Sequence, residues 1–395
     1  MLSRTQLDRY PAKMVSKLAD RLVDRYASNA SRILDPFCGS GAVLTAANRR
    51  GIPVTGVDVN PIAELFSRVK LRGFNPSRAV SLARELVNAA SGSVKPLPIE
   101  WAGKDYWFTP ATVSKFERLR GAAHELKLSR SADGIAVLLG LSLSVRLCSK
   151  ADQRSPKPFI SKEASENRKG RHFDPYTTLL GVLEDLGSSS ACVSSHRDSR
   201  FLLSDITSDS FAPRIAKHSH VITSPPYINA QDYFRNFKLE LYILEGLLPF
   251  RVEDLRTRFI GTERGDLLAG IPKEILNANC ETLPSLKALD RRTPRLAAVV
   301  HRYLFDMSRA FENVSSFMEH KAQFILVCGD NLIGGVRIRT WQVLRHMLER
   351  KGFILFEMFS DPIANRMLAP KRSGHKGLIK EEVVCAFRKS NARQG

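Results

Sequence analysis

The chain has 395 residues, of which 43% are hydrophobic, so it is long enough for one large domain or several smaller ones. Its 60 lysines and arginines exceed its 40 aspartates and glutamates; the net charge of +20 favours nucleic acid as the partner over a membrane surface. No apolar run is long enough to cross a bilayer and the N-terminus has no signal-peptide pattern, so we expect a cytoplasmic, nucleic-acid-associated protein.

The six cysteines lie far apart, and no two of them form a Cys-x-x-Cys pair. This spacing suggests neither a zinc site nor a disulfide framework. We therefore expect reduced cysteines and no bound metal.

An amphipathic helix is predicted near the N-terminus, because apolar residues recur at helical spacing from Met14 to Tyr26. The residues just before it read Arg-Tyr-Pro-Ala-Lys, from Arg9 to Lys13.

A short strand is predicted at Ile33–Asp35, followed by a glycine-containing turn and a helix. The turn consists of Pro36, Phe37, Cys38, Gly39, Ser40 and Gly41. Its glycines allow a tight turn and a close approach to a ligand, while the new helix presents unpaired N–H groups.

A second strand, Val54–Asp58, ends in a carboxylate that can accept hydrogen bonds from both hydroxyls of a ribose. The two strands predict an open α/β sheet, in which ligands bind at the carboxyl ends of the strands. A dinucleotide fingerprint would carry a third spaced glycine, which is missing here. The pattern therefore favours a nucleoside such as S-adenosylmethionine over NAD.

Residues 66–200 are predicted to be mainly helical, with a buried helix over 135–145 and a basic loop after it. Such a loop is often only a solvated surface, but it holds few acids, so we expect it to contact phosphates. The residues expected to bind nucleic acid there are Arg154, Lys157, Lys169 and Arg171.

Two further strands, 201–205 and 221–223, are predicted to return to the sheet. The first ends at Asp205, and the second leads into Ser224, Pro225, Pro226 and Tyr227. The prolines stiffen this turn and donate no hydrogen bonds, so it offers a ligand acceptors and an aromatic face. A nucleobase with an exocyclic amine suits such a turn.

Residues 250–297 are rich in arginine and are expected to form an inserted surface module that contacts DNA, with Arg256 and Arg258 among the contacting residues. After them we expect a long helix, strands at 324–328 and 353–359, a helix capped by Thr340, and a final strand at 383–387. A second basic loop before the last strand contains Lys371 and Arg372, which are also expected to bind DNA.

The chain resembles the amino-methylating DNA methyltransferases, which modify cytosine N4 or adenine N6. The segment from Asp35 to Gly41 looks like the family's methionine-binding turn, and Ser224 to Tyr227 like its catalytic loop. The segment with Tyr10, Pro11 and Lys13 is similar to the one that closes over the cofactor.

The resemblance implies an α/β fold with a Rossmann-like seven-stranded class I methyltransferase sheet, helices on both faces and helical or loop insertions. It implies S-adenosylmethionine bound by the Asp35–Gly41 turn, with Asp58 and Asp205 as further cofactor ligands. Ser224 and the Pro225 carbonyl would hold the protons of the amine, and Tyr227 would stack on a base flipped out of double-stranded DNA.

A serine ahead of Pro-Pro-Tyr is typical of cytosine-N4 enzymes, so the resemblance favours that atom over adenine N6. No cysteine follows a proline, which disfavours cytosine-C5 chemistry. An RNA amino-methyltransferase and a non-catalytic DNA-binding relative stay open as alternatives, and a partner restriction endonuclease, as in restriction-modification systems, is not visible in the sequence.

The chain is accordingly divided into five parts: 1–65, the N-terminal helix and first half of the cofactor-binding core; 66–200, a mainly helical insertion; 201–249, core strands with the catalytic loop; 250–297, an arginine-rich insertion; and 298–395, the C-terminal half of the core. Both insertions are candidates for recognising the target sequence.

Overall fold

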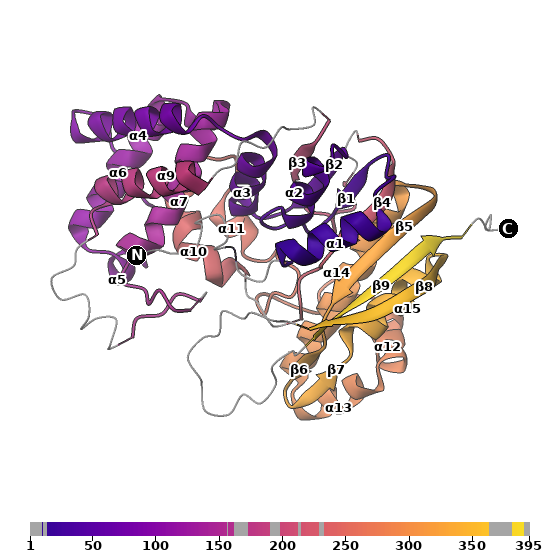
Figure 1. Ribbon diagram of the computed structural model, residues 1–395. Helices are drawn as coiled ribbons and strands as arrows, with labels where there is room; N and C mark the ends of the chain where they lie inside the picture. The colour runs from indigo at the N-terminus through magenta and orange to yellow at the C-terminus, as the bar shows by residue number, and fades with distance from the viewer. Residues whose placement is uncertain are drawn as a thin grey trace.

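A seven-stranded sheet forms the centre of the computed structural model, which describes residues 10, 14–155, 157–161, 173–189, 198–211, 215–228, 233–362 and 381–390 (Figure 1). The strands lie in the order β3-β2-β1-β4-β5-β9-β8, and β9 runs antiparallel to both its neighbours. Their bounds are Ile33–Asp35 (β1), Val54–Asp58 (β2), Arg200–Leu203 (β3), His218–Thr223 (β4), Met318–Cys328 (β5), Phe353–Pro362 (β8) and Glu381–Lys389 (β9). This order confirms the predicted Rossmann-like class I sheet.

Alternate residues of the central strands enter two different hydrophobic cores, one on each face of the sheet. Leu34 and Val221 pack on one face, whereas Ile33 and Ile222 pack on the other. Strands covered on both faces are expected to read as apolar runs, as β1 and β4 do at Ile33–Leu34 and Val221–Ile222. The centre of the sheet is therefore buried between two helical layers, and its carboxyl edge is left for a ligand.

The helices α1 (Ser16–Tyr26) and α2 (Ala42–Arg49) cover one face of the sheet. The other face is covered by α14 (Pro294–Ser316) and α15 (Thr340–Arg350). The first helix of each pair shows the apolar spacing from which it was predicted, although α14 also buries the polar residues His301 and Asp306.

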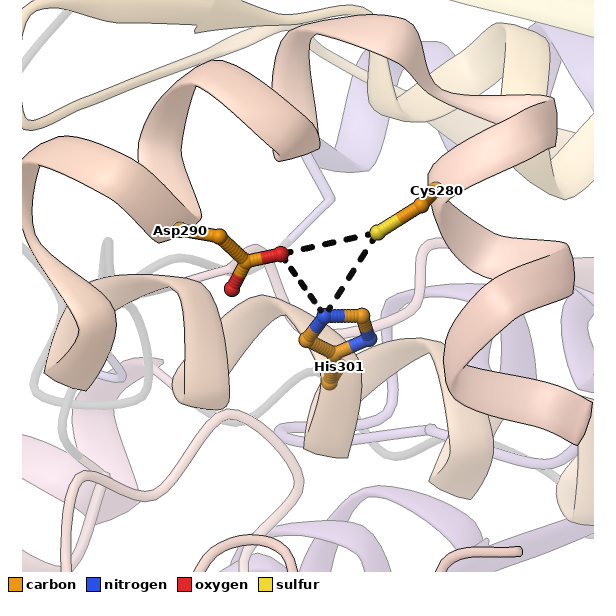
Figure 2. A group of neighbouring side chains, drawn as sticks. All are labelled: Cys280, Asp290 and His301. Atoms are coloured by element: carbon orange, nitrogen blue, oxygen red, sulfur yellow. Dashed lines mark hydrogen bonds and ion pairs between the residues drawn. The ribbon is translucent and has the colours of Figure 1, made fainter. Parts of the chain in front are cut away.

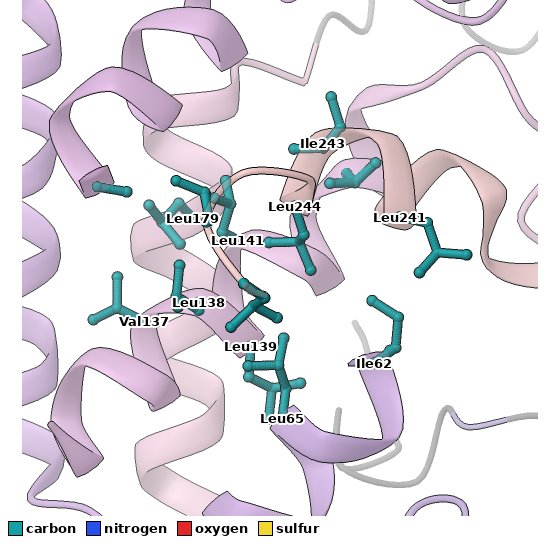
Figure 3. Close-up of a cluster of buried hydrophobic side chains, with 14 of the residues drawn as sticks. Ile62, Leu65, Val137, Leu138, Leu139, Leu141, Leu179, Leu241, Ile243 and Leu244 are labelled. Carbon is teal, nitrogen blue, oxygen red and sulfur yellow. The ribbon is translucent and has the colours of Figure 1, made fainter. Parts of the chain in front are cut away.

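A group of helices lies to the side of the sheet, and β3 returns from it to pair with β2 (Figure 1). The members are α3 (Pro61–Arg72), α4 (Pro76–Ser91), α5 (Lys104–Trp107), α6 (Pro110–Glu125), α7 (Ala132–Cys148), α9 (Pro175–Ser189) and α10 (Tyr233–Leu244). The predicted buried helix is α7, and its leucines contact α3, α9 and α10 in one apolar cluster (Figure 3).

The predicted arginine-rich module contains α11 (Val252–Leu255), α12 (Lys273–Thr282) and α13 (Pro284–Arg292). A two-stranded ribbon of β6 (Asn331–Ile333) and β7 (Val336–Ile338) lies beside α13 and was not predicted. The predicted boundaries after residues 65, 200 and 297 fall within α3, β3 and α14, so that division of the chain stays a proposal.

The prediction that Thr340 caps α15 is wrong. The N-cap is Arg339, which makes no side-chain capping bond. The buried Thr340 hydroxyl instead donates to Asn331 Oδ1 at 3.0 Å, so it fixes the β6–β7 ribbon to the start of the helix. A capping pattern in the sequence does not distinguish these two uses of a threonine.

None of the helices that the structure describes is both long enough and apolar enough to span a membrane.

Candidate active site

The two sequence motifs lie side by side, because β1 and β4 are neighbouring parallel strands. A hydrogen bond of 2.7 Å from Thr223 Oγ1 to Asp35 Oδ1 joins the ends of the two strands. The glycine turn after β1 and the Ser-Pro-Pro-Tyr turn after β4 therefore leave the same edge of the sheet. The strand order reverses between β1 and β4, which is where open α/β sheets bind ligands.

The turn after β1 depends on two glycines in the left-handed region. Gly39 has a φ of +48° and Gly41, the N-cap of α2, has a φ of +77°. A Cβ on Gly39 would lie 3.2 Å from Tyr10 Cε1, so this position is restricted by space as well as by conformation. The turn can thus come close both to a ligand and to the Tyr10 ring.

The carboxylate of Asp58 is held by backbone N–H groups. Gly39 N donates to Oδ2 at 2.8 Å, and Asn60 N donates to Oδ1 at 2.9 Å. Burial raises the pKa of Asp58 to about 6 even though these hydrogen bonds favour the ionised form. Each oxygen keeps a lone pair for a further donor, such as a ribose hydroxyl.

Asp35 is more deeply buried than Asp58, and its carboxyl group accepts hydrogen bonds from other groups of the protein. Its Oδ1 accepts from Thr223 and from the backbone N of Phe37 at 3.2 Å. Burial raises the pKa of this carboxyl to about 7. Asp35 thus connects the two motifs and also lines the cavity described next.

A cavity of about 800 Å³, part of it open to solvent, lies at this edge of the sheet. It is within the range of small-molecule sites, roughly 300–1,000 Å³. Eleven of its lining residues were singled out from the sequence: Tyr10, Asp35, Pro36, Phe37, Cys38, Gly39, Asp58, Asp205, Ser224, Pro226 and Arg258. Ser40, Gly41, Pro225 and Tyr227 are not among the lining residues.

The structure thus brings Asp58 and Ser224 to one cavity. Ser224 and Pro226 lie on its wall, which places the turn after β4 beside the glycine turn. Asp205 was predicted to end a strand but lies two residues after β3; it is also on the wall, with Oδ1 accepting from both N and Oγ1 of Thr207.

The predicted aromatic member of the motif, Tyr227, is turned toward the sheet. Its hydroxyl donates to Glu382 on β9, and its ring packs against the core beneath the sheet's second face. Burial and the Glu382 carboxylate raise the pKa of this phenol well above its usual value. Its stacking on a base stays a proposal.

Tyr10 is the described part of the N-terminal segment expected to close over the cofactor. Its ring lies against Phe66 and Phe237, and its hydroxyl accepts from Asn60 Nδ2 at 3.0 Å. Pro11 and Lys13 lie outside the described residues.

Several lining residues were missed by the sequence analysis. Two aromatic rings, Tyr233 at the start of α10 and Phe259 after α11, lie nearly parallel, with 16° between their planes and 6.5 Å between their centroids. Val59 and Ile206 each add apolar surface. Val59 and Ile206 could have been found from their positions, since each follows an aspartate expected to end a strand. Nothing in the local sequence pattern distinguished Tyr233 and Phe259.

A second hollow, of about 920 Å³ and partly open to solvent, adjoins the first and shares Asp205 and Arg258 with it. Four arginines line it: Arg258, Arg264, Arg302 and Arg309. Arg302 pairs with Asp306 at 2.9 Å and Arg309 with Asp209 at 2.7 Å. Arg256, predicted to contact nucleic acid, pairs with Glu253 on the surface.

The predicted basic loop after α7 is only partly described. Arg154 folds back on the buried Asp152, with Nη2 2.7 Å from Oδ2, and this contact holds the pKa of Asp152 well below its usual range. Lys157 is described and half-buried, whereas Lys169 and Arg171, together with Lys371 and Arg372 of the later loop, lie outside the described residues.

The chain shares sequence similarity with DNA-modifying enzymes. It is 27% identical to the type II methyltransferase M.MvaI of Kocuria varians over 29% of this chain and 28% of that protein. The similarity to M.AvaI of Nostoc sp. extends over 94% of this chain and 83% of that protein, at 22% identity. The chain therefore spans little more than a quarter of the first relative and most of the second.

Two further matches are to RNA-modifying enzymes. A stretch covering 13% of the chain and 16% of the relative is 44% identical to a tRNA (guanine(10)-N2)-dimethyltransferase of Methanothermobacter thermautotrophicus. The rRNA methyltransferase AviRa of Streptomyces viridochromogenes superposes over 97% of this chain and 89% of its own at 11% identity, but with a TM-score of 0.29. No protein-family profile matches the chain.

Proposed function

We propose that this protein, a distant relative of the type II DNA methyltransferases, transfers a methyl group from S-adenosylmethionine to the exocyclic amine of a flipped DNA base, with cytosine N4 preferred. One observation carries the proposal. Asp58 and Ser224, which come from separate motifs, line a single cavity at the point where the strand order of the sheet reverses.

The residues around Asp58 fit the cofactor. Its carboxylate can accept from both ribose hydroxyls, and the Gly39 turn lets the methionine part of the cofactor pass close to the backbone. Val59 and Ile206 offer apolar surface to an adenine ring, while Asp205 is an acceptor for its amine. Three carboxyl groups, those of Asp35, Asp58 and Asp205, line the cavity, and in their ionised form they also suit a cationic ligand. S-adenosylmethionine would supply a methyl group already activated by its sulfonium.

The turn after β4 would prepare the amine. The lone pair of an exocyclic amine is delocalised into its ring, which makes it a poor nucleophile. Acceptors at the Ser224 hydroxyl and the Pro225 carbonyl would bind its two protons and favour a pyramidal nitrogen. The prolines keep these acceptors fixed, so alignment with the methyl group costs little further ordering.

An aromatic surface for the flipped base is available beside this turn. Tyr233 and Phe259 line the same cavity as Ser224 and Pro226. A base stacked on either ring would keep its amine near the acceptors. Tyr227 reaches the base only if its hydroxyl leaves Glu382.

The preference for cytosine N4 rests on Ser224, since a serine before Pro-Pro-Tyr resembles the motif of the cytosine-N4 enzymes. Adenine N6 is the alternative, because serine and aspartate both accept from an amine.

Double-stranded DNA is the proposed substrate because the chain carries a net charge of +20 and the arginine-lined hollow opens beside the cavity. Arginines placed there can hold the phosphates next to an extruded nucleotide and help offset the cost of unstacking it. A partner restriction endonuclease and a cytoplasmic location stay predictions.

RNA is the second candidate substrate, since a short stretch of the chain is similar to the tRNA dimethyltransferase. The basic surface would serve either nucleic acid.

Incubation with radiolabelled S-adenosylmethionine and mixed-sequence duplex DNA tests the proposal. We expect label in the DNA, and nucleoside digestion should yield N4-methyldeoxycytidine. N6-methyldeoxyadenosine would keep the enzyme class and change the base. Label only in added tRNA or rRNA would support the second candidate, and no transfer to any nucleic acid would refute both.

A further inference from the structure

Three side chains of different chemistry point toward one another in the arginine-rich module (Figure 2). Cys280 comes from α12, Asp290 from α13 and His301 from α14. Their ligand atoms all lie within 4.8 Å of one another. Among the residues that the structure describes, no other such group combines a thiol, a carboxylate and an imidazole.

The imidazole and the carboxylate lie too far apart for a strong hydrogen bond, whereas the thiol can donate a weak one to the carboxylate. Cys280 Sγ lies 3.5 Å from Asp290 Oδ2, His301 Nε2 lies 3.5 Å from the same oxygen, and the sulfur lies 4.0 Å from the nitrogen. A strong N–H···O bond between an imidazole and a carboxylate would be about 2.7–3.2 Å long. The three atoms therefore surround a common point rather than pairing closely with each other.

The same separations suit a tetrahedral zinc ion. With metal bonds of about 2.3 Å to sulfur and about 2.0–2.1 Å to nitrogen and oxygen, tetrahedral angles place the ligand atoms roughly 3.3–3.6 Å apart. The largest change required is a shortening of the 4.0 Å sulfur–nitrogen separation by about half an ångström. We propose that Cys280, Asp290 and His301 bind one zinc ion, with water as the fourth ligand.

The surroundings of the three ligands support the assignment. The His301 side chain is 6% exposed, whereas that of Asp290 is 41% exposed, so solvent can reach the point that the three atoms surround. The other ring nitrogen of His301, Nδ1, lies 3.4 Å from Asn279 Nδ2. A flip of this amide, which exchanges its oxygen and nitrogen, would let Nδ1–H donate to the amide oxygen and would leave Nε2 free for the metal.

A metal here would fix a helix with little apolar support. Asn279, at 9% exposure, is the one buried residue of α12. Zinc would connect this helix to α13 and α14 through bonds that its own apolar contacts do not supply. None of the three ligands lines the cavity with Asp58 and Ser224, so the proposal stands apart from methyl transfer.

The search for Cys-x-x-Cys pairs could not find this site, because such a pair needs two ligands close together in the sequence, whereas here each of three helices supplies a single ligand.

Cobalt titration of the full-length protein, stripped of metal with a chelator, tests the proposal. We expect one Co²⁺ per chain, with a thiolate-to-cobalt charge-transfer band and intense visible bands of tetrahedral coordination, and displacement by Zn²⁺. Cys280→Ser and His301→Gln should abolish the thiolate band and tight binding, respectively. Cys148→Ser, a partly exposed cysteine outside the group, is the matched control and should bind as wild type does.

Asp290→Asn keeps the test decisive if the buried variants unfold, because Asp290 is the most exposed of the three. It should weaken cobalt binding by at least the roughly 10- to 100-fold that a lost supporting group causes. Chelator should also lower the Tm of wild type more than that of this variant. No thiolate band in wild type, or unchanged binding by Asp290→Asn, would overturn the proposal.

Discussion

The backbone N–H of Gly39 donates a 2.8 Å hydrogen bond to Oδ2 of Asp58. The bond joins the turn after β1 to the end of β2, so the two groups assigned to the cofactor hold each other in place. A change at either residue is expected to disturb the other.

Asp58→Asn should weaken S-adenosylmethionine binding while leaving duplex binding unchanged. The substitution removes a charged acceptor for two hydroxyls, and each such hydrogen bond is worth about 1.5–3 kcal/mol, so we expect at least a tenfold rise in Kd by calorimetry. Asp105→Asn, an exposed aspartate on α5, is the control. Unchanged cofactor affinity would remove Asp58 from the ribose role.

Cofactor affinity should rise with pH through about 6, the pKa that burial gives to Asp58 in the free protein. Below that pKa the carboxyl carries a proton, and the ionised form is the better acceptor, so Kd should worsen by up to about tenfold for each pH unit. The step should be missing in Asp58→Asn and present in wild type. A flat profile for wild type from about pH 5 to 7 would contradict it.

Gly39→Ala should impair cofactor binding more than left-handed strain alone predicts. Its Cβ would lie 3.2 Å from the Tyr10 ring at a φ of +48°. Gly51→Ala is the matched control: Gly51 has a φ of +67°, but nothing lies within 4 Å of its Cβ. Both variants should lose about 1–2 kcal/mol of stability in denaturant unfolding, but only Gly39→Ala should lose cofactor affinity. Equal affinities would show that the turn tolerates a methyl group.

Ser224→Ala should reduce turnover at least a hundredfold, since it removes an acceptor for the reacting amine. DNA affinity, measured by fluorescence anisotropy, should stay within twofold of wild type. Ser188→Ala, on the exposed side of α9, should leave both unchanged. Undiminished turnover would mean that the carbonyl acceptors suffice without the hydroxyl.

Arg258→Gln should flatten the salt dependence of DNA binding, reducing the slope of log K against log[salt] by about one. Lys157→Gln tests the basic loop after α7 in the same way and with the same expected change. Lys17→Gln, on the exposed side of α1, is the control with an equal change in net charge. A slope unchanged from wild type would mean that the substituted residue is solvated and does not contact a DNA phosphate.

Local sequence was enough to predict the core of the site because its parts depend on short-range geometry. A strand, two glycines and a helix start follow directly from residues 33–44, and Asp58 ends the next strand. Neighbouring parallel strands then bring such ends to one edge without further information.

Other parts of the site depend on contacts between distant segments. Tyr233 and Phe259 meet only once α10 and the segment after α11 have packed, and Tyr227 turns away because Glu382, on the last strand, accepts its hydroxyl. Similarly, Thr340 bonds to Asn331 rather than to its own helix. No periodicity records such long-range partners.

The helices α4 to α9 leave the sheet after β2 and α3 and return at β3, and β3 pairs directly with β2. This helical lobe therefore begins and ends on adjacent strands, so it joins the sheet at a single place. Replacing these helices with the corresponding helices of a relative, joined at β2 and β3, should leave Asp58 and Ser224 in place. On the prediction that this insertion recognises the target, exchange of the lobe would change the target sequence and leave the proposed reacting groups untouched.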